Sequence, residues 1–280
     1  MNRADWAVAA YGLAAAASWG GGDFSGGLAS RRTDVFAAAT VSRAVGCSAQ
    51  IVLALVLGDA WATSRQLAWA VAAGVAGGVG LAALYRALAV GRMGINAPIT
   101  GAVAAAVPVL FGAVTQGLPT VTRAAGFAIA LWGVWRLARP EGPTGRPVGI
   151  GLALLAGLGF GGFYVLITQA RGVSLFWPLA ASTGASLVLL IGLATATRQR
   201  VVPCPVALPI ALAAGALDAG GNIFFVLAAH AGRLDVAAVL SSLYPVVTVL
   251  GARVILKERV SRGQAVGITA ALAAIPLIAG

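Results

Sequence analysis

The sequence predicts an all-α integral membrane protein with ten transmembrane helices, arranged as two inverted five-helix repeats around a central cavity. Three observations predict this fold class. Of the 280 residues, 60% are hydrophobic and only 10% are charged, against roughly 25% charged residues in a soluble domain. The apolar residues form ten blocks of membrane-spanning length. The second half of the chain also aligns on the first at one constant offset.

The small share of charged residues excludes a water-soluble fold. A soluble domain of this size must still expose much of its surface to water, and this chain has too few polar residues to cover that surface. The lipid bilayer is therefore its expected surroundings. The net charge of +11 comes from basic residues that lie mostly at block ends, where they prefer cytoplasmic anionic headgroups. No nucleic-acid partner is expected.

Charges, prolines and turn residues divide the chain into blocks of about 20 residues, the length that crosses a bilayer core as a helix. Backbone groups find no water in lipid, so each block is predicted to be helical. The predicted spans are 5–29, 35–58, 66–91, 94–115, 119–138, 148–170, 174–197, 206–231, 234–256 and 261–279.

A proline-rich stretch divides the chain into two units. Residues 140–147 contain three prolines, which exclude a helix and predict a linker. The linker separates a first five-helix repeat, residues 1–139, from a second, residues 148–280. At an offset of 141 residues the apolar blocks coincide, and Gly20 falls on Gly161. Because five is an odd number of spans, the second repeat is predicted to be inverted, as in carriers with a binding site near the midplane.

Ionisable residues inside the predicted spans are the first candidates for function, because each costs a few kcal/mol on insertion scales. These are Asp23, Arg43, Arg86 and Asp218. No position related to them by the 141-residue offset is charged, so the fold does not require these charges twice. Asp23 is predicted to pair with Arg43 or with Arg86. A structural ion pair and a role in gating or substrate contact both remain open.

Asp218 and Asn222 form a second candidate group in the middle of the eighth span. They are four residues apart and therefore share one helix face. Asp218 is predicted to bind a substrate amino group or to take up a coupling proton. Hydrogen bonding between helices is the alternative for both residues.

The sequence gives no indication of a metal site, a cofactor or an enzyme. Two cysteines and the single histidine, His230, form no pattern of metal ligands. Lys257 is the only lysine and belongs to no phosphate-binding loop. No pair of nucleophile and base is recognisable either, so a protein without enzymatic activity and without a cofactor is expected.

The end of the second repeat resembles a known family. The run from Leu243 to Leu250 is followed by Leu256-Lys257-Glu258-Arg259 and by Gly263-Gln264-Ala265-Val266-Gly267-Ile268. Together they resemble the end of an EamA repeat of the drug/metabolite transporter superfamily, and Trp19-Gly20 fits the first helix of its ten-helix form. The first repeat departs from this pattern, because Gln116-Gly117-Leu118-Pro119 stands where the second has Lys257-Glu258-Arg259-Val260.

The resemblance implies a secondary transporter that moves small polar metabolites by alternating access. Export of amino acids, aromatic ones included, is the leading expectation, by a monomer or a homodimer. The alternatives are an uncoupled facilitator or channel and, from another class, an intramembrane enzyme or a structural subunit of a membrane complex. By the same resemblance, the aromatic residues expected to line the cavity are Trp19, Tyr85, Phe160, Tyr164, Phe224 and Tyr244.

The basic residues predict an orientation in a cell inner membrane. Thirteen of them lie near the odd-numbered connections between spans, and five lie on the side of the chain termini. The positive-inside rule then places the odd-numbered connections in the cytoplasm and both termini in the periplasm.

Overall fold

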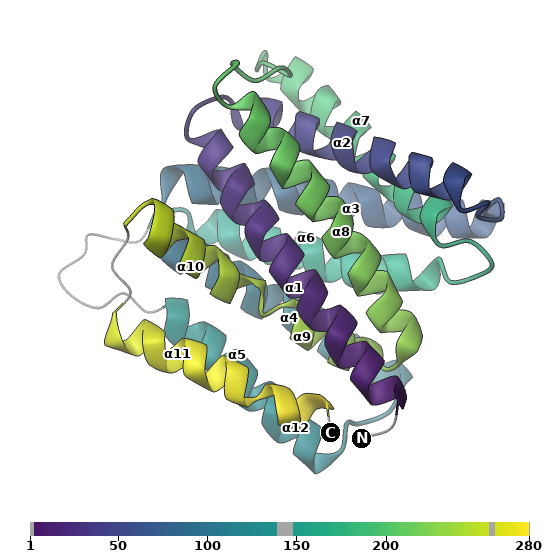
Figure 1. The fold of residues 1–280 in the computed structure, drawn as a ribbon, viewed down its shortest axis with the longest axis vertical. Coiled ribbons are helices and arrows are strands. Elements are labelled where there is room, and N and C mark those ends of the chain that lie inside the picture. The colour runs from purple at the N-terminus through teal and green to yellow at the C-terminus, as the bar shows by residue number, and fades with distance from the viewer. Residues whose placement is uncertain (1–2, 139–147, 258–260, 280) are drawn as a thin grey trace.

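The computed structural model describes residues 3–138, 148–257 and 261–279, and this part of the chain contains helices and no strands. The predicted linker, 140–147, lies outside the described residues. Figure 1 shows the helices of the first half, which are α1 (Arg3–Ser30), α2 (Val35–Val56), α3 (Ser64–Val90), α4 (Met93–Thr115) and α5 (Val121–Ala138). The helices of the second half are α6 (Ile150–Gln169), α7 (Phe176–Ala196), α8 (Leu208–Ala231), α9 (Leu234–Ser241), α10 (Tyr244–Ile255), α11 (Arg262–Ala273) and α12 (Ile275–Ala279).

Each of the ten predicted spans is helical over most of the length that the structure describes. The ninth span consists of α9 and α10, and the tenth consists of α11 and α12. Seven of the described helical stretches are long and apolar enough to cross a membrane. The helices α1, α5 and α11–α12 fall outside that count, although they occupy predicted spans. The all-helical membrane class is confirmed.

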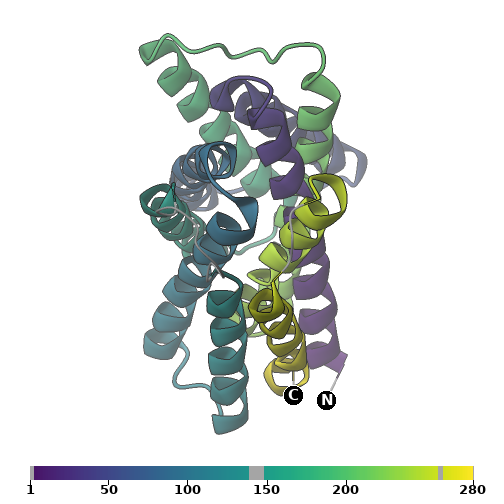
Figure 2. The same ribbon diagram turned by 90° about the vertical axis from the view of Figure 1, so that its left-hand side faces the viewer.

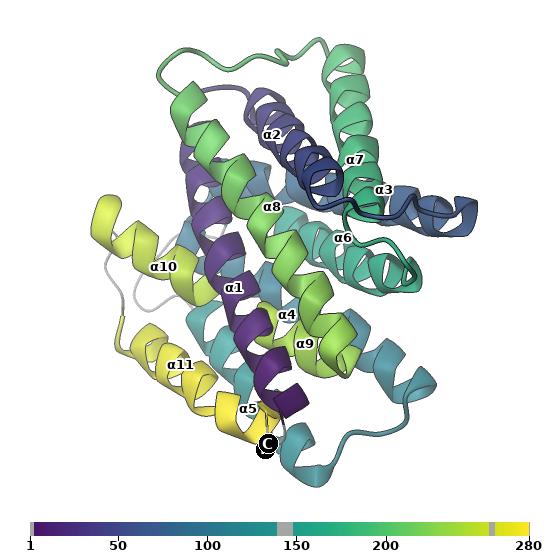
Figure 3. The ribbon, with the colours of Figure 1, turned by 45° about the vertical axis from the view of Figure 1, so that its right-hand side comes forward.

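The two halves pack mainly against each other. Helix α1 packs along α8, and α3 packs along α6; Figure 3 shows α1 and α8 side by side. These two pairs correspond at the 141-residue offset, because α6 is the counterpart of α1 and α8 is the counterpart of α3. Helix α2 packs on its own counterpart α7, and α5 packs on α11 and α12 next to the chain termini (Figure 2). This pairing supports the predicted duplication, and the inverted relation of the halves stays a prediction.

Glycines allow the closest of these helix crossings. A Cβ atom on Gly74 of α3 would overlap the backbone of Ser182 in α7. A Cβ atom on Gly215 of α8 would lie 2.5 Å from the carbonyl oxygen of Ser42 in α2. Gly215 corresponds to Gly74 at the 141-residue offset, so the same crossing occurs in both halves. Small residues at such positions let helix backbones approach in a membrane.

The ninth span is interrupted near its middle. Helix α9 ends at Ser241 and α10 begins at Tyr244. Pro245 has no backbone N–H, so it cannot complete the helical hydrogen bond that would bridge this point. In the corresponding helix of the first half, α4 continues through Pro98 and Pro108. The interruption is therefore particular to the second half.

The connection between α2 and α3 caps the start of α7. The Asp59 carboxylate accepts hydrogen bonds from the backbone N–H groups of Leu175 at 3.1 Å, Phe176 at 2.7 Å and Trp177 at 3.3 Å. It also accepts one from the Ser174 hydroxyl at 2.9 Å. A negative side chain is favourable at a helix N-terminus, where backbone N–H groups are unpaired. Asp59 therefore fixes one end of α7 to the first half.

Candidate functional site

A pocket lies where helices of both halves meet. Its empty volume is about 370 Å³, which includes space open to the outside. Eight of the eleven predicted site residues line it, and two further residues, Gly77 and Phe163, complete the lining. The eight predicted residues are Trp19, Asp23, Arg43, Phe160, Tyr164, Asp218, Asn222 and Tyr244.

A chain of four hydrogen-bonded side chains forms one wall of this pocket. Arg43 of α2 and Asp218 of α8 form a bidentate ion pair, with Nη1 3.0 Å from Oδ2 and Nη2 3.1 Å from Oδ1. The Asn222 side-chain amide donates to Asp218 Oδ2 at 3.1 Å. The Trp19 indole N–H donates to Asn222 Oδ1 at 3.2 Å. The chain joins α1, α2 and α8, and Asp218 and Asn222 share the helix face that the sequence predicted.

Asp23 stands outside this chain. Its predicted pairing with Arg43 is wrong, because the guanidinium group pairs with Asp218. Its predicted pairing with Arg86 is also wrong, because Arg86 is exposed on α3 and does not line the pocket. Within the described residues Asp23 makes no hydrogen bond or ion pair, although it is only 7% exposed. The pocket therefore holds a buried carboxylate that no described side chain binds directly.

Two aromatic residues expected in the cavity lie elsewhere. Tyr85 is buried against Gly26 of α1, where a Cβ atom would overlap its ring. Phe224 packs against the hydrophobic core, and the ring of its neighbour Phe225 stacks on Tyr164 with centroids 4.5 Å apart. Adjacent residues of a helix point in directions about 100° apart, so Phe225 faces Tyr164 and its neighbour Phe224 does not.

Aromatic rings form another part of the lining, which shares Trp19 with the polar chain. Trp19 and Tyr164 stack with ring centroids 5.4 Å apart, and the Phe163 ring meets Tyr164 edge-on at 6.0 Å. Gly77 faces this wall, and a Cβ atom there would lie 3.4 Å from the Phe163 ring. Sequence reasoning missed Phe163 and Gly77. The spacing of three residues between Phe160 and Phe163, which places them on one helix face, was the available signal.

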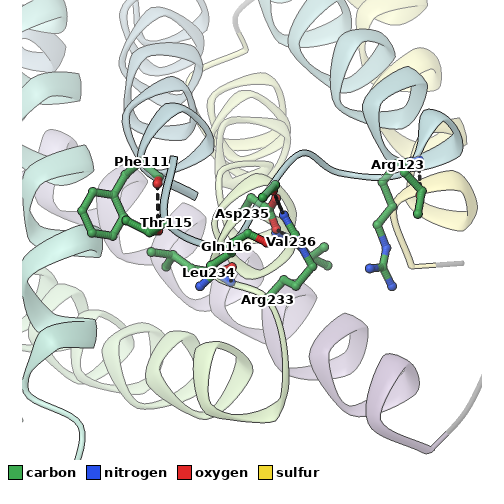
Figure 4. A network of polar contacts seen from close by, with 10 residues as sticks. Phe111, Thr115, Gln116, Arg123, Arg233, Leu234, Asp235 and Val236 are labelled. Atoms are coloured by element: carbon green, nitrogen blue, oxygen red, sulfur yellow. Dashed lines mark hydrogen bonds and ion pairs between the residues drawn. The ribbon is translucent and has the colours of Figure 1, made fainter. Parts of the chain in front are cut away.

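A second polar network joins the two halves between the end of α4 and the start of α9 (Figure 4). Arg233 pairs with Asp235, with Nη2 2.8 Å from Oδ2, and donates to the carbonyl oxygens of Gln116 at 3.2 Å and Gly117 at 2.8 Å. The Gln116 side chain accepts a hydrogen bond from the Leu234 N–H at 3.3 Å. The hydrogen bond to Asp235 raises the pKa of Arg233 above its ordinary value, so this group stays charged at physiological pH.

A wider and more open cavity lies beside this network. Its empty volume is about 630 Å³, and none of the predicted site residues lines it. Among the residues that the structure describes, no group of three or more His, Cys, Asp or Glu side chains is arranged to hold a metal ion. The cavity is lined by Phe111, Thr115, Gln116, Thr168, Gln169, Arg171 and Leu234.

Comparisons with known proteins bear on both the fold and the family. A crystal structure of another protein superposes on 96% of this chain and on 95% of its own, with a TM-score of 0.72 at 18% sequence identity. At that identity the likeness shows the fold alone. No curated protein matches the sequence significantly. Residues 147–280 match the EamA-like transporter family, the family whose repeat the end of the chain resembles. The second half of the chain, residues 147–280, therefore belongs to the EamA-like transporter family of membrane proteins.

Proposed function

We propose that the protein is a secondary transporter that carries a small amphipathic metabolite, in the first instance an amino acid, across the membrane by alternating access. The central pocket is the observation that carries this proposal. It combines an unpaired carboxylate, an ion-paired arginine and an aromatic wall. Membership of the EamA-like family supports transport, and the pocket supports the class of substrate.

The charges of the pocket favour a ligand with a cationic group. Its lining contains two carboxylates, Asp23 and Asp218, and one guanidinium group, that of Arg43. Arg43 is engaged in a direct ion pair with Asp218, so one guanidinium group faces two carboxylates and the pocket keeps an excess negative charge at Asp23. An uncompensated charge inside a membrane protein is costly, so Asp23 attracts a positive group. The ammonium group of an amino acid supplies it, and the aromatic wall offers apolar surface to the remainder of the ligand.

The position of the pocket supports alternating access. Residues from both halves line it, as expected of carriers whose site lies between two repeats. The Arg233 network also holds the halves together between α4 and α9. Its contacts must open if the halves are to rock about the pocket. Export as the direction follows from the family resemblance, and periplasmic termini follow from the basic residues.

Uptake by purified protein in liposomes tests the proposal. A panel of radiolabelled amino acids is offered with and without an imposed pH gradient, and protein-free liposomes serve as the control. Saturable accumulation that collapses with the gradient is the expected result and identifies a coupled carrier. Saturable flux that only equilibrates identifies the alternative, an uncoupled facilitator. The absence of flux for every amino acid overturns the proposed substrate class.

A further inference from the structure

We infer that Arg43 and Tyr244 form a subsite for the carboxylate group of the substrate, beside the site that Asp23 offers to its cationic group. This inference rests on the proposed function and deepens it. It makes the substrate a zwitterion whose two charges are held at the same time by different residues of the pocket.

Arg43 retains an unused donor. Its Nη1 and Nη2 atoms are engaged with Asp218, but its Nε atom is buried and has no hydrogen-bond partner. The side chain is only 6% exposed and lines the central pocket. Buried donors nearly always have partners in native structures, because an unsatisfied one loses its hydration without replacement. A ligand acceptor in the pocket would supply what Nε lacks.

Tyr244 presents a second unused donor at the same pocket. Its hydroxyl oxygen is buried without a partner, and the residue is only 1% exposed. Tyr244 begins α10, directly after the interruption of the ninth span. The hydroxyl group of Ser241, at this interruption, is also buried and without a partner. Unpaired polar atoms thus gather where discontinuous helices hold polar ligands in other carriers.

A carboxylate matches these donors better than a neutral group does. It only accepts hydrogen bonds, and its two oxygens accept from several donors at once. Hydrogen bonds from a guanidinium group to a carboxylate are also among the strongest in proteins. Because Arg43 remains paired with Asp218 through its other nitrogens, the ligand does not have to break that ion pair. A zwitterion leaves the net charge of the pocket unchanged and pairs each of its own charges locally.

The competing ligand is an amine without a carboxylate, which would satisfy Asp23 alone. Two matched pairs of probes separate the possibilities: L-phenylalanine against phenethylamine, and L-leucine against isoamylamine. Equilibrium binding of each radiolabelled probe to the purified protein is measured independently of flux. We expect each amino acid to bind at least about tenfold more tightly than its amine, since hydrogen bonds to charged groups contribute this much or more.

Tyr244→Phe removes only the unpaired hydroxyl group, and Tyr11→Phe is the control, because Tyr11 is exposed on α1 and does not line the pocket. Tyr244→Phe should weaken binding of the amino acids about tenfold or more and leave binding of the amines within about twofold. Tyr11→Phe should change neither. Since the Tyr244 hydroxyl has no protein partner, the variant should unfold at or above the temperature of the wild type.

Three results overturn the inference: amines that bind as tightly as amino acids, amino-acid binding that survives Tyr244→Phe, or a Tyr244→Phe protein that is less stable than the wild type. Absence of binding by all four probes overturns it as well. Binding of amino acids that is sensitive to Tyr244→Phe but without flux in liposomes would support the subsite and refute transport. Flux of amines alone would refute the subsite and leave a transporter of a different substrate class.

Discussion

The order of stability among three variants of the central pocket follows from the buried charge that each variant leaves without an ion-pair partner. Arg43→Gln removes the cation and leaves two buried carboxylates, Asp23 and Asp218, each 7% exposed. Removing one partner of a buried ion pair costs about 3–5 kcal/mol, and we expect the free energy of unfolding to fall by the upper part of this range. This variant should be the least stable of the three.

Asp218→Asn also breaks the ion pair, but it leaves Arg43 in the same pocket as Asp23. Asp23 can then become the new partner of the guanidinium group, so the loss should be smaller, about 1–3 kcal/mol. Asp23→Asn removes the unpaired charge and leaves the Arg43–Asp218 pair intact. We expect it to lose no stability and to gain about 1 kcal/mol, since an unsatisfied buried group is costly.

Chemical denaturation of the purified variants in one detergent measures this order, with Asp34→Asn as the control for loss of a carboxylate that caps no helix through its side chain. The reasoning is refuted if Asp23→Asn is as unstable as Arg43→Gln, because Asp23 would then have a structural partner. The same Asp23→Asn protein should lose transport. Gain of stability together with loss of function would mark Asp23 as a residue kept for its activity at a cost in stability.

Three further predictions concern the scaffold. Asp59→Ala removes the cap of α7 and should lower the free energy of unfolding by about 2 kcal/mol. Asp34→Ala should change it by less than about 0.5 kcal/mol. Equal losses of unfolding free energy for the two variants, measured by chemical denaturation, would contradict the capping role. Gly74→Ala forces a methyl group into the α7 backbone and should lower the free energy of unfolding by about 2 kcal/mol or more. The control Gly192→Ala, with no atom within 4 Å of the new Cβ, should leave it unchanged or raise it by up to about 1 kcal/mol. Thermal unfolding compares the two variants. Arg233→Gln should speed hydrogen exchange in the 116–120 loop. An arginine side chain is charged throughout the range from about pH 7 to pH 9 even with an ordinary pKa, and the hydrogen bond to Asp235 raises the pKa of Arg233 further. The ratio of variant to wild-type exchange rates should therefore not change across this range; a ratio that falls would contradict the role of the charged Arg233 contacts.

Hydropathy predicted the helices closely because the membrane imposes their length. The predicted span 35–58, for example, is Val35–Val56 in the structure. The shared face of Asp218 and Asn222 was also predictable, since a spacing of four residues is a local property of a helix. Such features depend on neighbours in the sequence, and the sequence therefore predicts them well.

The partner of Arg43 was not predictable in this way. Two carboxylates share its pocket, and the one it binds, Asp218, is 175 residues away in the sequence. The predicted depth of Asp23 in the membrane made it a candidate partner of Arg43. Depth alone does not show whether Asp23 or Asp218 forms the ion pair, because that depends on how α2 and α8 pack. Whether Phe224 or Phe225 stacks on Tyr164 similarly depends on the rotation of α8 about its axis. Hydropathy does not determine that rotation when both residues are apolar.

The predicted duplication accounts for a pocket with unlike side chains at matching positions. At the 141-residue offset, Trp19 corresponds to Phe160, Asp23 to Tyr164 and Gly77 to Asp218, and all six residues line the pocket. At these three pairs of positions both predicted repeats reach the cavity with different side chains, whereas the counterparts of the other four lining residues do not line it. In two of the three pairs one member is a carboxylate and the other is aromatic or glycine, so the charged groups collect on α1, α2 and α8 and the apolar surface on α6. A symmetric pocket would have suited a symmetric or uniformly apolar ligand. This one should hold its substrate in a single orientation, with the charged end toward Asp23 of α1 and Arg43 of α2 and the apolar end against Phe160 and Phe163.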